Sequence, residues 1–186
     1  YFFFFFKAQQ EFVGFSAEKA INHQMHPSSA QKLFTKRVGL YNKSFNAIIA
    51  LTKPDQIAKD IDALTTSSKT STQVTGMPVA VKEVMDVRGF PTTLCDSSLK
   101  KGFVGTLYTR DKSEEQEAAV VKRLRESGAI IVGKTNIPTK GLDVQCSNAI
   151  HGTTTNPWDP LRTSGGSSGG SCVAVATGMV PLALGR

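Results

Sequence analysis

Two features of the sequence could carry out chemistry together: a run of glycine and serine residues, and a lysine at the end of an apolar stretch. The run Thr163–Ser171 (TSGGSSGGS) contains four glycines and four serines in nine residues. Such a composition also occurs in flexible linkers. Here an apolar segment follows directly, and glycine permits unusual backbone angles and close approaches. We therefore interpret the run as a turn that presents serine hydroxyls.

A serine nucleophile requires a base, and the sequence offers two residue types. The histidines are His23, His26 and His151. None has a neighbouring carboxylate in a pattern that indicates a catalytic triad, and His151 is interpreted as a loop residue. Lys82 ends the apolar segment PVAVK, where burial would lower its pKa and let a neutral amine accept a hydroxyl proton. A lysine at a strand end can equally extend its ammonium to solvent, and spacing alone leaves both interpretations open.

A second glycine-containing motif is excluded. Residues 128–135 (GAIIVGKT) fit the phosphate-binding pattern G-x-x-x-x-G-K-[ST]. The four middle residues are apolar and predict a buried strand, whose backbone N–H groups would be engaged in a sheet. We therefore expect Lys134 and Thr135 at a strand end and no phosphate site.

The elements that would position these residues alternate along the chain. The pattern predicts helices over residues 28–44, 53–64, 114–128 and 172–179, strands over 46–51, 77–84, 129–136 and 180–185, and a polar loop over 67–76. Alternating helices and strands indicate an α/β fold.

Composition narrows the possible function classes. The 186 residues are 40% hydrophobic and 20% charged, with a net charge of +7. No apolar run approaches the roughly 20 residues of a membrane-spanning helix. The nearest basic cluster lies on one predicted helix and is interpreted as a solvated face rather than a nucleic-acid site: Lys32, Lys36, Arg37 and Lys43.

Cysteine usage indicates the compartment. Cys95, Cys146 and Cys172 are an odd and sparse set, which argues against a disulfide framework and for a reducing, cytoplasmic location. We find no motif for a metal ion or a cofactor.

Three segments resemble the amidase signature family: residues 76–93 (GMPVAVKEVMDVRGFPTT), 128–138 (GAIIVGKTNIP) and 156–185 (NPWDPLRTSGGSSGGSCVAVATGMVPLALG). The resemblance runs in order from about Ser28 to Gly185. It implies a mixed β-sheet core flanked by helices, with residues 28–186 as the N-terminal part of a single amidase-signature domain and residues 1–27 as a segment it does not place.

The resemblance also implies a catalytic triad of serine, cis-serine and lysine. Lys82 matches the lysine base, and Ser167 matches the bridging serine, which follows a cis peptide bond from Gly166. Ser168, Gly169 and Gly170 would shape the turn. In such enzymes the nucleophile attacks an amide carbonyl, forms an acyl-enzyme, and water then releases the acid.

The sequence departs from the family pattern after Leu184-Gly185. Family members continue there as T-D-x-G-G-S, whose last serine is the nucleophile, whereas this sequence reads Arg186 and ends. We expect an N-terminal part of an amidase, truncated before the nucleophile and inactive alone, with apolar surface exposed around residues 180–185. The aromatic run at residues 1–6 fits no amphipathic period and is expected to be foreign or unpaired, with Met25 as a sensible start.

Three functions remain open. The first is an amidase that hydrolyses linear carbon–nitrogen amide bonds of a small-molecule substrate, with no cofactor, no nucleic acid and a homodimer as one assembly. The second is the amidotransferase version of the same fold, a subunit of a glutamyl-tRNA(Gln) amidotransferase, in which released ammonia goes to a misacylated tRNA. The third is a truncated, non-catalytic binding protein. We prefer the first, because no feature of the sequence specifies tRNA.

Overall fold

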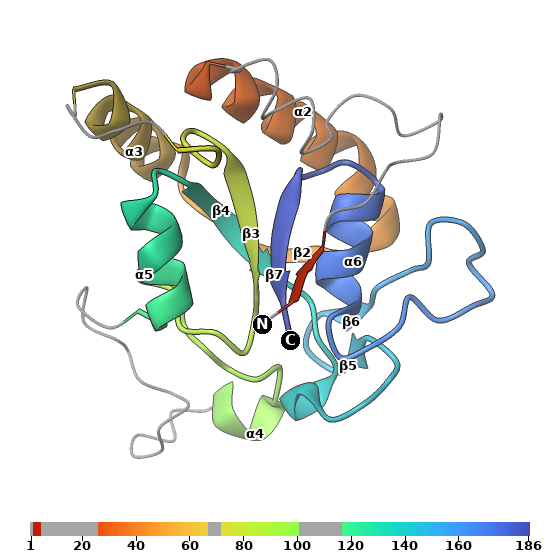
Figure 1. The fold of residues 1–186 in the computed structure, drawn as a ribbon. Coiled ribbons are helices and arrows are strands. Elements are labelled where there is room, and N and C mark those ends of the chain that lie inside the picture. Colours follow the sequence, from red (N-terminus) through yellow and green to blue (C-terminus); the bar gives the residue numbers. More distant parts are fainter. Residues whose placement is uncertain (1, 5–25, 67–71, 101–116) are drawn as a thin grey trace.

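The computed structural model describes residues 2–4, 26–66, 72–100 and 117–186. A five-stranded mixed sheet lies at its centre (Figure 1), with the strand order β1-β7-β3-β4-β2. The strands are β1 (Phe2–Phe4), β2 (Ile48–Leu51), β3 (Pro78–Lys82), β4 (Ile130–Thr135) and β7 (Leu182–Gly185). Strands β7, β3 and β4 run parallel, while β1 and β2 pair antiparallel at the two edges. This arrangement confirms the predicted α/β class with a mixed sheet.

Helices surround the sheet (Figure 1). They are α2 (Pro27–Phe45), α3 (Pro54–Thr66), α4 (Ser97–Lys100), α5 (Ala119–Glu126), α6 (Gly169–Ala176) and the 3₁₀ helix η2 (Thr139–Gly141). A small hairpin of β5 (Ser147–Asn148) and β6 (Gly152–Thr153) was not predicted from the sequence. Predicted features at residues 1, 5–25, 67–71 and 101–116, including the start at Met25 and the first turn of the helix expected from residue 114, lie outside the described residues.

Two apolar clusters pack on the sheet. Ala80 of β3 joins side chains of α2, α3 and α6 in one cluster, whereas Val79 and Val81 join side chains of α5 in the other. Successive strand residues point to opposite faces. A parallel strand covered on both faces therefore requires an unbroken apolar sequence. This explains why PVAV and IIV do not alternate with polar residues.

The segment before Arg186 is not exposed, contrary to expectation. Residues 180–185 are buried. Helix α6 packs on β7, and β1 pairs along the outer edge of β7, with Phe2 opposite Gly185 and Phe4 opposite Ala183. Part of the aromatic run is therefore a strand of the main sheet.

Arg37 does not lie on a solvated helix face, contrary to the prediction from the sequence. Its side chain is only 8% exposed, because the helical period places it on the same stripe as Phe34 and Val38. The guanidinium donates to the carbonyl oxygens of Gly178 (2.6 Å) and Thr177 (2.7 Å). Carbonyls at the C-terminal end of a helix lack intrahelical donors and carry partial negative charge. Arg37 thus ties α2 to the end of α6 and does not belong to a solvated face.

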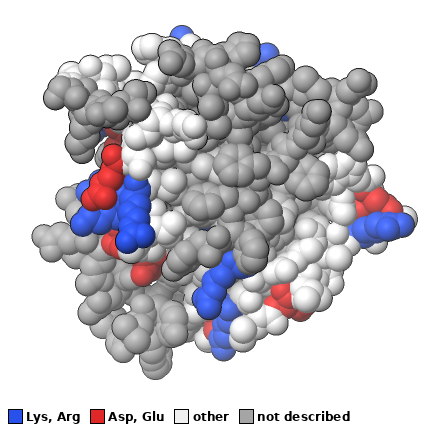
Figure 2. All heavy atoms as spheres, in the orientation of Figure 1, with Lys and Arg blue, Asp and Glu red and all other residues white. Residues whose placement is uncertain are grey.

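Charges at the surface are mixed. On the face drawn in Figure 2, several basic side chains lie beside acidic ones. The described ion pairs include Arg125 with Asp60 and Glu117, Arg162 with Asp159, and Lys140 with Asp96.

Replacing Arg37 should loosen the end of α6. Arg37→Met leaves two buried carbonyl oxygens without donors, so we expect the free energy of unfolding to fall by about 2–4 kcal/mol in urea titrations. Lys36→Met, at an exposed position of the same helix, should change it by less than about 0.5 kcal/mol. Equal effects of the two substitutions would contradict the anchoring role.

Candidate active site

Lys82 and Ser167 are brought together by the fold. Lys82 is the last residue of β3 and is 2% exposed. Its Nζ donates to Ser167 Oγ at 2.5 Å and also contacts the backbone oxygen of Arg186 at 3.4 Å. The peptide bond between Gly166 and Ser167 is cis, the geometry that the resemblance implies. Of the two interpretations that spacing left open, the structure shows the buried lysine.

The surroundings of Lys82 favour the neutral amine. Burial is the main cause that lowers the pKa of Lys82 below 10.5, and the Arg186 cation lowers it further. Thiolates at Cys146 and Cys172 would raise it. Burial, however, raises the pKa of both thiols above 9.0, so they are neutral at neutral pH. In the part of the chain that the structure describes, no aspartate or glutamate side chain pairs with Lys82, and a neutral amine can accept a proton.

The other serines of the run join separate parts of the chain. Ser168 Oγ donates to the Arg186 oxygen at 2.9 Å and accepts from the Arg186 N–H at 3.1 Å. Ser171 Oγ donates to the Leu184 oxygen at 2.9 Å and lies 2.6 Å from Thr135 Oγ1. These contacts hold the start of α6 against the ends of β4 and β7. The sequence did not predict these contacts of Ser171 and Thr135. Ser171, however, belongs to the glycine–serine run that the sequence singled out.

The glycines of the run permit close backbone approach. A Cβ at Gly170 would lie 2.6 Å from the Asn136 oxygen and 2.7 Å from the Ala47 oxygen. A Cβ at Gly169 would lie 2.5 Å from Cys146 Cβ. A Cβ at Gly166 would lie 2.5 Å from the Asp143 oxygen. Real side chains do not fit at such distances, so the turn requires glycine there.

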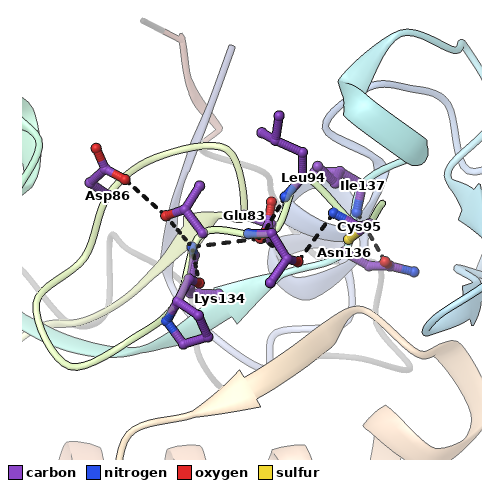
Figure 3. Close-up of polar contacts among 10 residues, drawn as sticks. Glu83, Asp86, Leu94, Cys95, Lys134, Asn136 and Ile137 are labelled. Atoms are coloured by element: carbon purple, nitrogen blue, oxygen red, sulfur yellow. Dashed lines mark hydrogen bonds and ion pairs between the residues drawn. The ribbon is translucent and has the colours of Figure 1, made fainter. Parts of the chain in front are cut away.

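A second buried lysine has different partners. Lys134 Nζ donates to the Pro91 oxygen (3.0 Å) and Thr92 Oγ1 (3.2 Å) and lies 3.9 Å from Glu83 Oε1 (Figure 3). Its backbone pairs with Val81 in the sheet. The excluded phosphate loop is thus strand β4, as predicted.

Other candidate residues are placed elsewhere. His151 lies in the turn between β5 and β6, where its backbone oxygen accepts from Asn46 Nδ2; His23 lies outside the described residues. Among the described residues, no group of three or more histidine, cysteine, aspartate or glutamate side chains could hold a metal ion. No described helix is long and apolar enough to cross a membrane.

Comparisons with known proteins give one consistent result. The family model named Amidase matches residues 30–186. A glutamyl-tRNA(Gln) amidotransferase subunit of Rhodopirellula baltica is 42% identical over 130 residues, which are 70% of this chain and 24% of that protein. The same subunit of Picosynechococcus is 39% identical over 141 residues, 75% of this chain and 27% of that protein.

Solved structures agree. An amidase crystal structure is similar with a TM-score of 0.72 and 30% identity, covering 91% of this chain and 37% of that one. A 6-aminohexanoate cyclic dimer hydrolase is similar with a TM-score of 0.71 and 27% identity, covering 90% of this chain and 32% of that one. The glutamyl-tRNA(Gln) amidotransferase subunit of Thermotoga maritima is similar with a TM-score of 0.71 and 26% identity, covering 97% of this chain and 35% of that one. The chain spans about a quarter to a third of the length of these relatives.

The lowered pKa of Lys82 predicts a pH-dependent stability. An unfolded lysine keeps its proton up to about 10.5, whereas the folded one loses it at lower pH. Between these two values the unfolded chain binds more protons, so the free energy of unfolding rises with pH, by at most about 1.4 kcal/mol per pH unit.

Urea titrations of the chain with an amidated C-terminus between pH 7 and 10.5 check this prediction, because a terminal carboxylate at Arg186 would favour the charged form of Lys82. The stability of the wild type relative to Lys82→Met should rise with pH. Burial raises the pKa of Cys95 to about 12, an opposing contribution that is present in both proteins and cancels. Lys122→Met, at an exposed position, controls for the loss of a positive charge. A difference that is constant or falls with pH would contradict the assignment.

Close packing at Gly170 predicts a second effect. Gly170→Ala forces a Cβ against two backbone carbonyls and should destabilise the chain by about 2–3 kcal/mol. Gly39→Ala, inside α2 where no described atom would lie within 4 Å of the new Cβ, should stabilise it by about 0.5–1 kcal/mol. Thermal unfolding of both variants measures the contrast; similar shifts in Tm would show that the turn is not tightly packed.

Proposed function

Because the chain belongs to the amidase family, we propose that Lys82 and Ser167 are two members of a Ser–cis-Ser–Lys triad that cleaves carbon–nitrogen amide bonds. The observation that carries the proposal is the 2.5 Å contact from a buried lysine amine to Ser167 Oγ, with a lowered lysine pKa. Residues 28–186 are then the N-terminal part of one amidase-signature domain.

The proposed reaction moves one proton along a short relay. Neutral Lys82 accepts the Ser167 proton, and Ser167 accepts the proton of the nucleophilic serine as that serine attacks the amide carbonyl. The proton returns through Ser167 to the departing amine, so the carbon–nitrogen bond breaks and an acyl-enzyme remains. Water then attacks the ester and releases the acid.

The nucleophile is proposed to follow Arg186 in the parent enzyme. The sequence holds no T-D-x-G-G-S segment after Leu184-Gly185, where the family pattern has its nucleophile. The Arg186 backbone lies within hydrogen-bond reach of Lys82 and Ser168. A polypeptide that continues from Arg186 therefore starts beside Lys82 and beside Ser168, the residue that follows Ser167.

The substrate is proposed to be a linear amide of a small molecule, cleaved without a cofactor. We retain the expectation of a reducing, cytoplasmic setting, which the three free thiols support.

A second candidate is favoured by the names of the curated relatives. Both curated relatives described above are the same subunit of a glutamyl-tRNA(Gln) amidotransferase. In this alternative the same relay releases ammonia for a tRNA-bound glutamyl group, and the partners are the other subunits of that enzyme. The Lys82–Ser167 contact serves both reactions, because both begin with cleavage of an acyl–nitrogen bond.

The relay is tested in a polypeptide that continues beyond Arg186 to the length of the relatives. Lys82→Met and Ser167→Ala should each lower the rate of ammonia release from simple amides by about 10²–10⁴-fold. Lys122→Met should retain the rate. The 186-residue chain by itself should release no ammonia; release that Lys82→Met abolishes would contradict the placement of the nucleophile.

Partner dependence separates the two candidates. A hydrolase should cleave small amides as a purified single protein. A member of an amidotransferase complex should release ammonia from glutamine at full rate only when its partner subunits and glutamyl-tRNA(Gln) are added.

A further inference from the structure

Glu83 follows Lys82 directly in the chain, but its carboxylate has a separate set of partners. Lys82 contacts Ser167 and Arg186, whereas Glu83, which is 2% exposed, faces Thr93, Leu94 and Lys134 (Figure 3). The relay does not use Glu83. Burying a carboxylate costs free energy unless it is paired and hydrogen-bonded, so the partners of Glu83 require an explanation.

The carboxylate holds a turn of unusual backbone geometry. Glu83 Oε1 accepts from the Thr93 N–H (2.6 Å), Thr93 Oγ1 (3.0 Å) and the Leu94 N–H (3.2 Å). Leu94 and Cys95 have φ values of 53° and 51°, a region that side chains other than glycine disfavour. Three donors converging on one oxygen compensate for this cost.

Lys134 completes the arrangement from the neighbouring strand. Its ammonium lies 3.9 Å from Glu83 Oε1 and donates to Pro91 and Thr92, the residues that enter the turn. Thr92 in turn donates to Asp86. Burial raises the pKa of Glu83, and the Lys134 charge and the turn N–H groups oppose this shift.

One buried cysteine lies in the turn, and another packs against the glycine–serine run. Cys95 is 1% exposed, and burial raises the pKa of its thiol to about 12. Cys146 packs against Gly169 at the start of α6, where a Cβ at Gly169 would lie 2.5 Å from Cys146 Cβ. Glu83 is linked to the Lys82–Ser167 contact by its peptide bond to Lys82, the last residue of β3, so the turn that holds Glu83 fixes the backbone directly after the lysine.

We infer that Glu83, held by Lys134, is a positioning residue: it fixes the Thr93–Cys95 turn and thereby keeps the Lys82 amine buried and aimed at Ser167. The inference rests on the proposed function, in which Lys82 is the base. In this inference Lys134 pairs with the Glu83 carboxylate and so keeps that carboxylate from pairing with Lys82.

The test follows the titration of Lys82 in the 186-residue chain with an amidated C-terminus, because a terminal carboxylate at Arg186, whose oxygen lies 3.4 Å from Lys82 Nζ, would itself raise the lysine pKa. Lysine labelled with carbon-13 at Cε gives an NMR signal that moves on deprotonation, and the signal of Lys82 is assigned by its loss in Lys82→Met. Glu83→Ala removes the acceptor of the turn, so water should reach Lys82 and raise its titration midpoint by about one pH unit, a tenfold loss of neutral amine at pH 7. Glu83→Gln retains an acceptor oxygen and should restore the wild-type midpoint.

Glu117→Ala is the matched control. Glu117 Oε1 also accepts from a backbone N–H, that of Arg88 (3.3 Å), and from a cation, Arg125 (2.9 Å), away from the relay. Its loss should leave the Lys82 midpoint unchanged. If Glu83→Ala does not fold, Thr93→Val, which removes one donor to Glu83 and the acceptor of the Cys95 N–H, should raise the midpoint in the same direction.

The outcomes are distinct. An unchanged midpoint in Glu83→Ala or, where that variant does not fold, in Thr93→Val would overturn the inference, as would equal rises in Glu83→Ala and Glu117→Ala. A wild-type midpoint at the ordinary value of 10.5 would overturn the proposed function itself, and the inference with it.

Discussion

The site depends on one constraint: an amine is buried at the end of a parallel strand, and a hydroxyl is its partner. Two buried lysines lie at this edge of the sheet: Lys82 is the last residue of β3 and 2% exposed, and Lys134 is the last but one of the neighbouring β4 and 1% exposed. Lys134 lies beside a carboxylate and two oxygen acceptors. Lys82 lies beside Ser167. Because an opposite charge favours the charged form and desolvation favours the neutral one, the partner decides which lysine suits proton transfer.

The glycine–serine run is the structural link between these strands. Glycine allows its backbone to approach the chain at Asn136 and Cys146 more closely than any side chain would permit. Ser168 and Ser171 then bind the backbone of the β7 region. Arg37 fixes the opposite end of the helix that this run begins. A segment with the composition of a flexible linker is thereby held from several sides.

The family comparisons fit a site that serves more than one enzyme. Hydrolases and amidotransferase subunits both resemble this chain over most of its described length. The residues shared with the family pattern surround the lysine and the serines, whereas the choice of acyl group and of ammonia acceptor depends on surfaces that meet the substrate. The chain covers about a quarter to a third of those relatives, and both residues of the proposed relay, Lys82 and Ser167, lie within it.

The sequence by itself determined the α/β class, the family and the exclusion of a phosphate loop, because strand periodicity, the glycine–serine run and apolar strands are local patterns. Local patterns also found most helices. They did not reveal that Arg37 is buried, that Phe2–Phe4 pairs with β7, or that Ser171, Thr135 and Glu83 join distant segments. These contacts connect residues from about 10 to more than 180 positions apart, and a polar side chain looks the same in sequence whether it meets water or a buried carbonyl. Only the tertiary structure decides that, because the cost of burial depends on the partner that the fold supplies.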